Sequence, residues 1–289
     1  MGGLGGIVMG LTWLGSGCTE VPCKDCGVGE QTDTGRLDSG TTPTTPTSPT
    51  TPTTTVPTGD TGPDTPGDTA VATDTGVTPA VPLAGFGTLS GACGELDDGE
   101  WLSTDPALFR NTLDLTGLTW DPAQMQLSPG GQQILAEGTL GGSSGESEAL
   151  AFDVLYRCEL AALVLSETHI VYLDAGGKKT DILTGIDGRN VGVSVTRSLT
   201  YVDPTERCGP VDPLATEELI VGKLQDLPLS EANASPKNPW ERSLLSVIAC
   251  DDAHADEVEA VWAAADPAVK GDALLVLTVT EGDDAFLYD

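Results

Sequence analysis

An α/β fold is predicted for residues 82–289, and three observations predict it. Apolar runs of strand length alternate with segments whose apolar residues recur at helical spacing, an order typical of α/β domains. Asp187 and Gly188 separate two strand-like segments, and this dipeptide favours a tight β-hairpin. Residues 41–81 lack the apolar content of a core, so the fold is expected to begin after them.

A disordered stalk is predicted for residues 41–81. Between residues 41 and 78 the chain has no aromatic residue and no Lys, Arg or Glu, and it consists almost wholly of Thr, Pro, Asp and Gly. Such a segment cannot bury enough apolar surface to offset the entropy lost on ordering. We therefore expect an extended, solvated tether that holds the domain away from an anchor.

The N-terminal residues indicate export. The apolar run at residues 7–14 is too short to cross the roughly 30 Å hydrocarbon core of a bilayer. Small residues follow it up to Cys18, and this arrangement resembles the bacterial lipoprotein signal. We expect a signal at 1–17, lipidation of Cys18, a Cys-rich head at 18–40 and a lipid-anchored protein of the bacterial cell envelope or outer surface; the alternative is a Gly-rich leader without that role.

The cysteine count suits an oxidising compartment. Seven cysteines are present, and lipidation of Cys18 leaves an even number for disulfides. The CxxC pair Cys23 and Cys26 favours a local disulfide over a zinc or redox site, since no second pair and no His lies near it. The other four cysteines allow three pairings, between which spacing does not choose: Cys93, Cys158, Cys208 and Cys250.

The formal net charge of −31 disfavours polyanionic partners. Neutralisation of phosphates is the main source of nucleic-acid affinity, so an acidic surface opposes DNA and RNA. A solvated, aggregation-resistant surface is the favoured explanation of the charge. Nucleic acid is therefore not an expected partner, and the ligand is an unidentified protein or small molecule.

The first elements of the domain follow from turn residues and apolar spacing. Residues 86–89 and 113–120 are strands or packing loops between Pro, Gly and Asp. Ser143 and Glu146 form a capping box that predicts the start of a helix. Apolar residues recur at helical spacing up to Leu165, so the helix is expected to reach that residue.

Beyond this helix we predict three strands, followed by helices that alternate with strands. The strands are expected at residues 169–173, 180–186 and 190–198, with the Asp187-Gly188 turn between the last two. Asp212 followed by Pro213 begins a second helix, because both residues are favoured at a helix start, and it is expected to extend to about residue 226. The remaining elements are a strand at 244–249, a helix at 252–264 and a strand at 273–280.

The resulting order, α-β-β-β-α-β followed by a further helix and strand, resembles the PD-(D/E)XK, or restriction-endonuclease-like, superfamily. The resemblance covers about residues 146–249 and rests on Lys179-Thr180-Asp181 and on the strand from Val191 to Arg197. It implies a mixed sheet in which Asp181 and an acid one hairpin later bind a divalent metal. It also implies a lysine, two residues beyond that acid, that orients the attacking water.

This sequence departs from the family pattern in the third strand. The spacing places the acid at Ser194 and the lysine at Thr196. A hydroxyl adds no negative charge for a hard cation, and threonine has no ammonium, so these two positions are degenerate. Substitutes are available in Glu148 or Glu159 for the carboxylate. Lys179 or Arg197 would then supply the positive charge.

Two functions follow from this reading. The first is a lipid-anchored protein presenting a catalytically degenerate nuclease-like domain with a binding or structural role, for which no cofactor is expected. The second is a phosphodiesterase or nuclease that uses Mg²⁺ or Mn²⁺ at a migrated site containing Asp181. Each substitute residue also has a structural explanation, since acids near a helix start and charges on turns are common without any site.

One further cluster has a metal-like composition. Asp251, Asp252, His254, Asp256 and Glu257 follow one another closely. Acids gathered in the first turn of a helix are expected from capping and from the helix dipole, so the structural interpretation is favoured. The chain has two histidines, which disfavours a Ser-His-Asp hydrolase.

Overall fold

The computed structural model of the chain describes residues 81–83, 85–121, 125–140, 144–203, 206 and 208–288. The predicted signal and Cys-rich head, with Cys18, Cys23 and Cys26, lie outside these residues, as does the predicted stalk except for its last residue, Val81, which begins a strand. Within the described part of the chain, no helix has the length and apolarity needed to cross a membrane.

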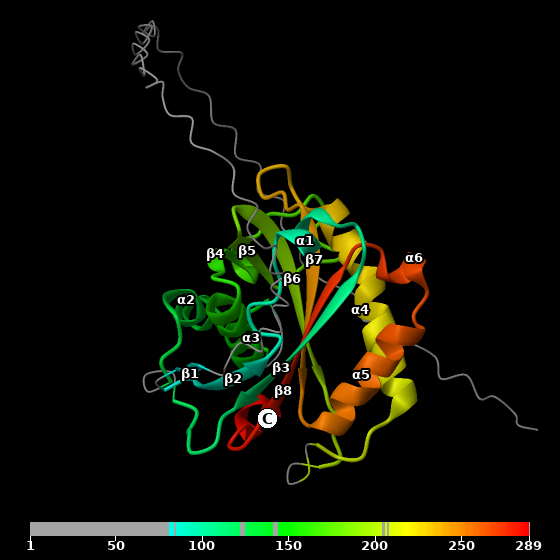
Figure 1. Cartoon of the computed structure of the whole chain (residues 1–289). Coiled ribbons are helices and arrows are strands. Elements are labelled where there is room, and N and C mark those ends of the chain that lie inside the picture. The colour runs from blue at the N-terminus through cyan, green and yellow to red at the C-terminus, as the bar shows by residue number, and fades with distance from the viewer. Residues whose placement is uncertain are drawn as a thin grey trace, which may run out of the picture. The chain divides into compact units, whose positions relative to one another are not determined.

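An eight-stranded mixed sheet forms the centre of the domain, in the order β1-β2-β3-β8-β7-β6-β5-β4 (Figure 1). Its four middle strands, β3, β8, β7 and β6, are parallel, and the outer strands on both sides pair antiparallel. The strands are β1 (Val81–Leu83), β2 (Gly87–Gly91), β3 (Ala107–Asp114), β4 (Ala162–Ser166), β5 (Ile182–Ile186), β6 (Arg189–Ser198), β7 (Arg242–Ala249) and β8 (Leu274–Glu281).

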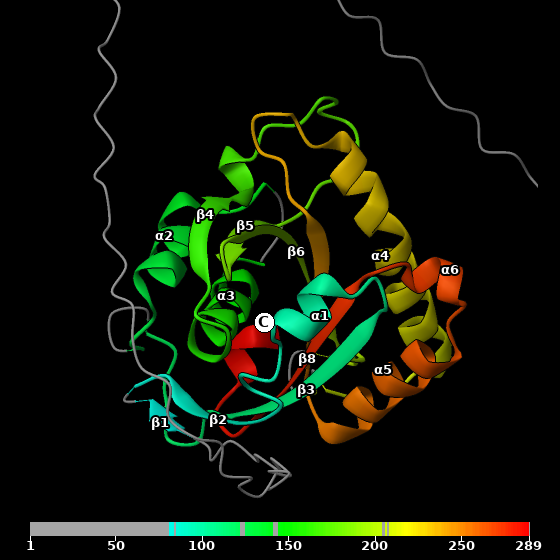
Figure 2. The ribbon, with the colours of Figure 1, turned by 45° about the horizontal axis from the view of Figure 1, so that its top comes forward.

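Helices cover both faces of this sheet, which confirms the α/β prediction. Helices α2 and α3 lie on one side, and α4, α5 and α6 lie on the other (Figures 1 and 2). The helices are α1 (Asp98–Leu102), α2 (Pro129–Glu137), α3 (Gly145–Cys158), α4 (Pro213–Asn233), α5 (Asp252–Ala264) and α6 (Pro267–Lys270), with 3₁₀ turns η1 (Glu167–His169) and η2 (Ala285–Tyr288).

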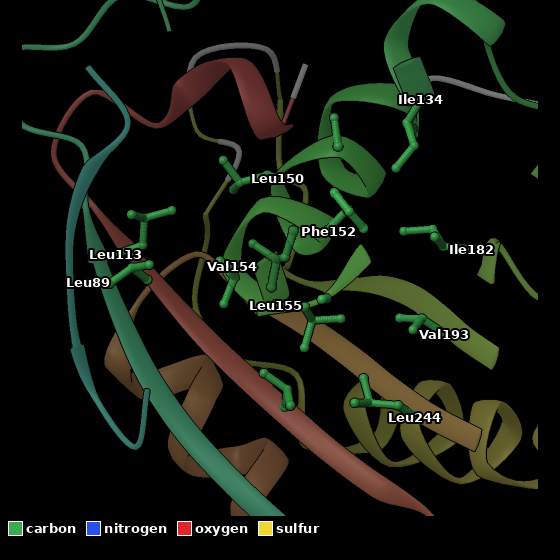
Figure 3. Close-up of a cluster of buried hydrophobic side chains, with 14 of the residues drawn as sticks. Leu89, Leu113, Ile134, Leu150, Phe152, Val154, Leu155, Ile182, Val193 and Leu244 are labelled. Atoms are coloured by element: carbon green, nitrogen blue, oxygen red, sulfur yellow. The ribbon is translucent and has the colours of Figure 1, made fainter. Parts of the chain in front are cut away.

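The continuous apolar runs of β7 and β8 are explained by burial on both faces. Leu244 belongs to the core shared with α3, which also contains Leu150, Val154 and Leu155 (Figure 3). The next residue, Leu245, belongs to the second core, which α4 and α5 cover. Because successive side chains of a strand point to opposite faces, a parallel strand covered on both sides is apolar along most of its length.

The predicted hairpin turn is confirmed. Ile186 pairs with Arg189, so Asp187 and Gly188 form a two-residue turn between β5 and β6. Both residues have positive φ, 49° for Asp187 and 77° for Gly188. A tight primed turn requires this conformation, and Asp-Gly adopts it at little steric cost.

Two glycine-to-alanine substitutions test this turn, because they are expected to change the free energy of unfolding in opposite directions. Gly188→Ala is expected to destabilise the domain by about 1–2 kcal/mol, because alanine at positive φ brings its Cβ close to the carbonyl oxygen. Gly222→Ala, in the middle of α4 with no atom within 4 Å of the added Cβ, is expected to stabilise it by up to about 1 kcal/mol. Urea unfolding of the two proteins checks both signs. Equal effects would contradict the assigned turn.

The helix predicted to reach Leu165 ends earlier, at Cys158. Leu160 has a φ of 53°, which interrupts the helix, and β4 begins at Ala162 and pairs with β5. The prediction of a strand at 169–173 is also wrong. That segment contains the end of η1 and one isolated bridge at Tyr172. Apolar residues of an edge strand followed the helical period by coincidence, and pairing with β5 decided their conformation.

Two other boundaries differ from prediction. Helix α3 begins at Gly145 with Ser144 as its N-cap, one residue after the predicted cap, and Ser143 lies outside the described residues. Helix α4 continues past residue 226 and Pro228 to Asn233. Leu227 is buried against the sheet core, and this packing extends the helix through the proline.

The four described cysteines form two disulfides. Cys93 pairs with Cys158, and Cys208 pairs with Cys250. The first links the segment after β2 to the end of α3, and the second links the loop before α4 to the end of β7. Such bonds persist in oxidising compartments, so the structure is compatible with an exported protein.

Candidate functional site

Three carboxylates from separate elements meet beside the start of β5. They belong to Glu148 in the first turn of α3, Glu167 at the start of η1 and Asp181 immediately before β5. One oxygen from each lies within 4.8 Å of the others. The fold brings together residues from three segments of the chain, so this group is defined by tertiary structure.

Asp181 is held against β6 by hydrogen bonds. The Val195 backbone N–H donates to one Asp181 carboxylate oxygen at 2.5 Å, and the Ser194 hydroxyl donates to the same oxygen at 3.2 Å. The Asp181 N–H donates to the Val193 carbonyl at 3.0 Å, which continues the β5–β6 ladder by one residue. These contacts place the aspartate rigidly at the end of a strand.

The two glutamates are also positioned by local structure. Glu148 is 2% exposed and lies in the first turn of its helix, where the dipole favours a negative charge. A Glu167 carboxylate oxygen accepts a hydrogen bond of 2.7 Å from the Leu140 N–H. Helix α3, the loop after α2 and the loop before β5 therefore meet at this group.

Burial raises the pKa of all three carboxyls. Desolvation raises the pKa of Glu148 to about 8, and the negative charges of Asp181 and Glu167 add to that rise. Burial raises the pKa of Glu167, with Asp181 contributing, and burial also raises the pKa of Asp181. Each negative charge is thus costly at this place, and a divalent cation bound by these oxygens would relieve that cost.

Lys223 on α4 is the cation that acts on the whole group. Its ammonium lowers the pKa of Glu148, Glu167 and Asp181, in opposition to the larger effect of burial. Lys179 acts on Glu167 and lies with its Nζ 5.9 Å from the centre of the Tyr172 ring. The negative site therefore has a positive charge on its α4 side.

Tyr172 lies beside the carboxylates as well. Its hydroxyl donates to the Thr180 carbonyl at 2.9 Å and accepts from the Thr180 N–H at 2.9 Å. Burial, with the charges of Asp181 and Glu167, raises the pKa of Tyr172 to about 12. The phenol is thus a neutral group that fixes the loop leading into Asp181.

The structure brings together Asp181, Glu148 and Lys179 of the residues singled out from the sequence. Ser194 lies next to Asp181 and is 6% exposed, while Thr196 continues β6 opposite Val247.

Glu159 and Arg197 lie in other groups. A Glu159 oxygen accepts from the Gly94 N–H at 3.1 Å, and the charges around it are Asp187, Glu100 and Glu95. Desolvation raises the pKa of Glu159 to about 7. The Arg197 guanidinium donates to the Leu287 carbonyl at 2.5 Å, in η2.

Sequence reasoning missed Glu167 and Lys223. Glu167 follows β4, a strand that the sequence pattern assigned to a helix, so its position next to Asp181 had no local signal. Lys223 is the single basic residue of α4, and this isolation on an otherwise acidic helix was the available signal. Neither residue lies in a recognisable motif.

The donor set fits a hard divalent cation. Mg²⁺, Mn²⁺ and Ca²⁺ prefer carboxylate oxygens, and three of them from three elements are within reach of one another. The pKa values of the three carboxyls stay raised although the Lys223 ammonium opposes the rise, so their charges are compensated only in part. Glu148, Glu167 and Asp181 would hold the ion.

Comparisons with known proteins give little functional information. No family model matches the chain, and no solved structure matches it. The AAC-rich mRNA clone AAC4 protein of Dictyostelium discoideum is 36% identical over 132 residues, which is 45% of this chain and 19% of that protein. The match thus spans about a fifth of the relative's length.

Proposed function

We propose that the domain hydrolyses phosphodiesters with a divalent cation held by Glu148, Glu167 and Asp181. The observation that carries the proposal is the meeting of these three carboxylates within 4.8 Å, with Lys223 acting on all of them. The element order α3-β4-β5-β6-α4-β7 and the neighbouring positions of β4, β5, β6 and β7 in the sheet support the resemblance to the restriction-endonuclease-like superfamily.

The residues of the chain divide into binding and charge-stabilising roles. The three carboxylates bind and orient the cation, which when bound polarises a phosphoryl oxygen and lowers the pKa of its water. Asp181 is kept in place by the hydrogen bonds from Ser194 and Val195. Lys223 stabilises the negative charge that develops on the phosphoryl oxygens, which replaces the lysine missing from position 196.

The substrate class is narrowed by the charge of the protein. With a formal net charge of −31, long polyanions are repelled at a distance. A short or small phosphodiester carries few charges and is less affected. We therefore infer a small phosphodiester as the substrate rather than double-stranded DNA or RNA.

A test compares two half-buried carboxylates, one inside the group and one outside it. The full chain with Mn²⁺ is expected to hydrolyse bis(p-nitrophenyl) phosphate, and Asp181→Ala is expected to lower the rate by at least about 100-fold, because a ligand of the cation is lost. Glu159→Ala removes another half-buried carboxylate, one that lies outside the group, and is expected to retain the rate. Metal-dependent turnover equal in wild type and Asp181→Ala would overturn the proposal.

A second candidate is a binding role without catalysis. It is favoured by Ser194 and Thr196, which occupy the positions where the family pattern has an acid and a lysine. In that case no phosphodiester is cleaved in the presence of Mn²⁺. Metal-dependent turnover that Asp181→Ala abolishes favours the enzyme, and the absence of such turnover favours this role.

We further propose that the mature protein is lipid-anchored at Cys18 in the bacterial envelope. The disulfides Cys93–Cys158 and Cys208–Cys250 support export, and the leader residues before Cys18 support the anchor. Mass spectrometry of the protein from a lipoprotein-processing bacterium is expected to show an acylated N-terminal Cys18. A mature chain with an unmodified Cys18 would refute the anchor.

A further inference from the structure

A second group of metal-ligating side chains lies where β7 ends and α5 begins. It consists of Cys208, Cys250, Asp251 and His254, and one ligand atom from each lies within 4.8 Å of the others. The sequence pattern had suggested a helix start rich in acids. The fold adds the two cysteines, which are joined in this structure as a disulfide.

One imidazole nitrogen faces all three other donors. His254 Nδ1 lies 3.4 Å from Cys250 Sγ and 3.7 Å from Cys208 Sγ. It also lies 2.7 Å from a carboxylate oxygen of Asp251. Two ligands of a tetrahedral zinc ion, with Zn–N of about 2.0 Å and Zn–S of about 2.3 Å, are roughly 3.5 Å apart. Both sulfur–nitrogen distances are close to that value.

The rest of the ring is supported as a metal ligand requires. His254 is 1% exposed, and its Nε2 lies 3.3 Å from the Thr200 hydroxyl oxygen. In the disulfide form Nδ1 lies within hydrogen-bond distance of the Asp251 carboxylate. In the tautomer whose Nε2–H donates to the Thr200 hydroxyl, the Nδ1 lone pair is available to a metal and the far nitrogen still sets the ring orientation. Cys250 is also buried, at 8% exposed. The ligands are thus held by the end of a central strand and the first turn of a helix.

We propose that reduction of the Cys208–Cys250 disulfide creates a Zn²⁺ site with Cys208, Cys250, Asp251 and His254 as ligands. A dithiol reductant transfers two electrons and two protons to the two sulfur atoms and becomes a disulfide itself. The S–S bond breaks and two thiols form. Zn²⁺ then binds both sulfurs as thiolates and releases the two protons.

These residues can therefore link the loop before α4 to the start of α5 in two ways, one oxidised and one reduced. In the oxidised state the covalent bond makes the link, and neither sulfur has the negative charge that a metal ligand needs. In the reduced state two thiolates, an imidazole and a carboxylate form a donor set that suits zinc. The inference is independent of the proposed hydrolase, since none of its residues is shared.

The test uses the full chain and Co²⁺ as a spectroscopic substitute for Zn²⁺. The protein is reduced with dithiothreitol, freed of it under argon and titrated with Co²⁺. We expect one ion per chain to give thiolate charge-transfer and tetrahedral d–d absorption, and Zn²⁺ to displace that ion. The oxidised protein is expected to lack both absorption bands.

Matched variants separate this site from the other thiols. Cys208→Ser/Cys250→Ser retains the remaining cysteines and is expected to lose the bands, whereas Cys93→Ser/Cys158→Ser is expected to keep them. His254→Ala is expected to lose tight binding, and Thr200→Val to weaken it by about 10- to 100-fold while keeping the spectrum. Glu148→Gln is expected to leave the bands unchanged.

Several outcomes would overturn the inference. Reduced wild type without the bands would do so, as would bands that persist in the Cys208→Ser/Cys250→Ser or His254→Ala proteins. Should the reduced protein unfold, recovery of its far-UV circular dichroism on addition of Zn²⁺ supports the site. Failure of Zn²⁺ to restore that signal overturns it.

Discussion

Glu148→Gln is expected to stabilise the metal-free protein by about 3 kcal/mol at pH 9 while it removes tight Mn²⁺ binding. Glu148 is 2% exposed, and burial raises its pKa from 4.5 to about 8. In the wild type the unfolded state therefore loses its proton at lower pH than the folded state. Folding stability falls as the pH rises from about 4.5, and this loss is complete above about 8.

Glutamine has nearly the same shape and does not titrate, so the variant lacks this decline. The check is urea unfolding of both proteins in chelator at pH 5 and pH 9. The difference in the free energy of unfolding is expected to be small at pH 5 and large at pH 9. Because other carboxyls titrate in both proteins, only the difference between them is interpreted. A constant difference would show that Glu148 ionises in the folded protein as easily as in the unfolded chain.

A gain of stability together with a loss of binding is characteristic of a functional site. Like charges that are buried side by side cost free energy unless a ligand compensates them. In the wild type, Mn²⁺ is therefore expected to raise the thermal midpoint, since it binds the folded state. In Glu148→Gln this increase should be largely absent.

Lys223→Met is expected to lower kcat for the phosphodiester by about 100-fold and to leave Mn²⁺ binding intact. The ammonium of Lys223 acts on all three carboxylates, and it balances negative charge on the α4 side of the group. Its removal takes away a positive charge that competes with the metal, so Mn²⁺ affinity is expected to stay equal or to rise. The developing charge of the reacting phosphoryl group, however, loses its stabilisation.

Calorimetry with Mn²⁺ and steady-state kinetics separate these two effects. Lys179→Met is the matched control, because Lys179 acts on Glu167 and its Nζ lies over the Tyr172 ring, whereas Lys223 acts on all three carboxylates. A smaller loss of kcat is expected there. An unchanged kcat in Lys223→Met would assign Lys223 to charge balance in the resting site and not to the reaction.

The candidate site was predictable from sequence only in part. Asp181 and Glu148 could be named because one precedes a recognisable strand and the other begins a helix with clear apolar spacing. Glu167 could not, because β4 has residues that also fit a helical period. Lys223 could not, because its approach to the carboxylates depends on how α4 packs across the sheet.

The sequence by itself determined the elements whose formation depends on residues close to one another along the chain. Helix α5 begins at Asp252 and ends at Ala264 as predicted, and the Asp187-Gly188 turn has the positive φ values that its residues favour. These features follow from capping, apolar spacing and turn conformation, which act over a few residues.

Only the tertiary structure decided which distant groups meet. The pairing of Cys93 with Cys158, the end of α3 at Cys158 and the meeting of Glu148 with Glu167 and Asp181 all require contacts between segments far apart in the chain. Such contacts form because the sheet buries apolar surface on both faces, and the free energy of that burial outweighs the local preferences of an edge strand or a charged cluster.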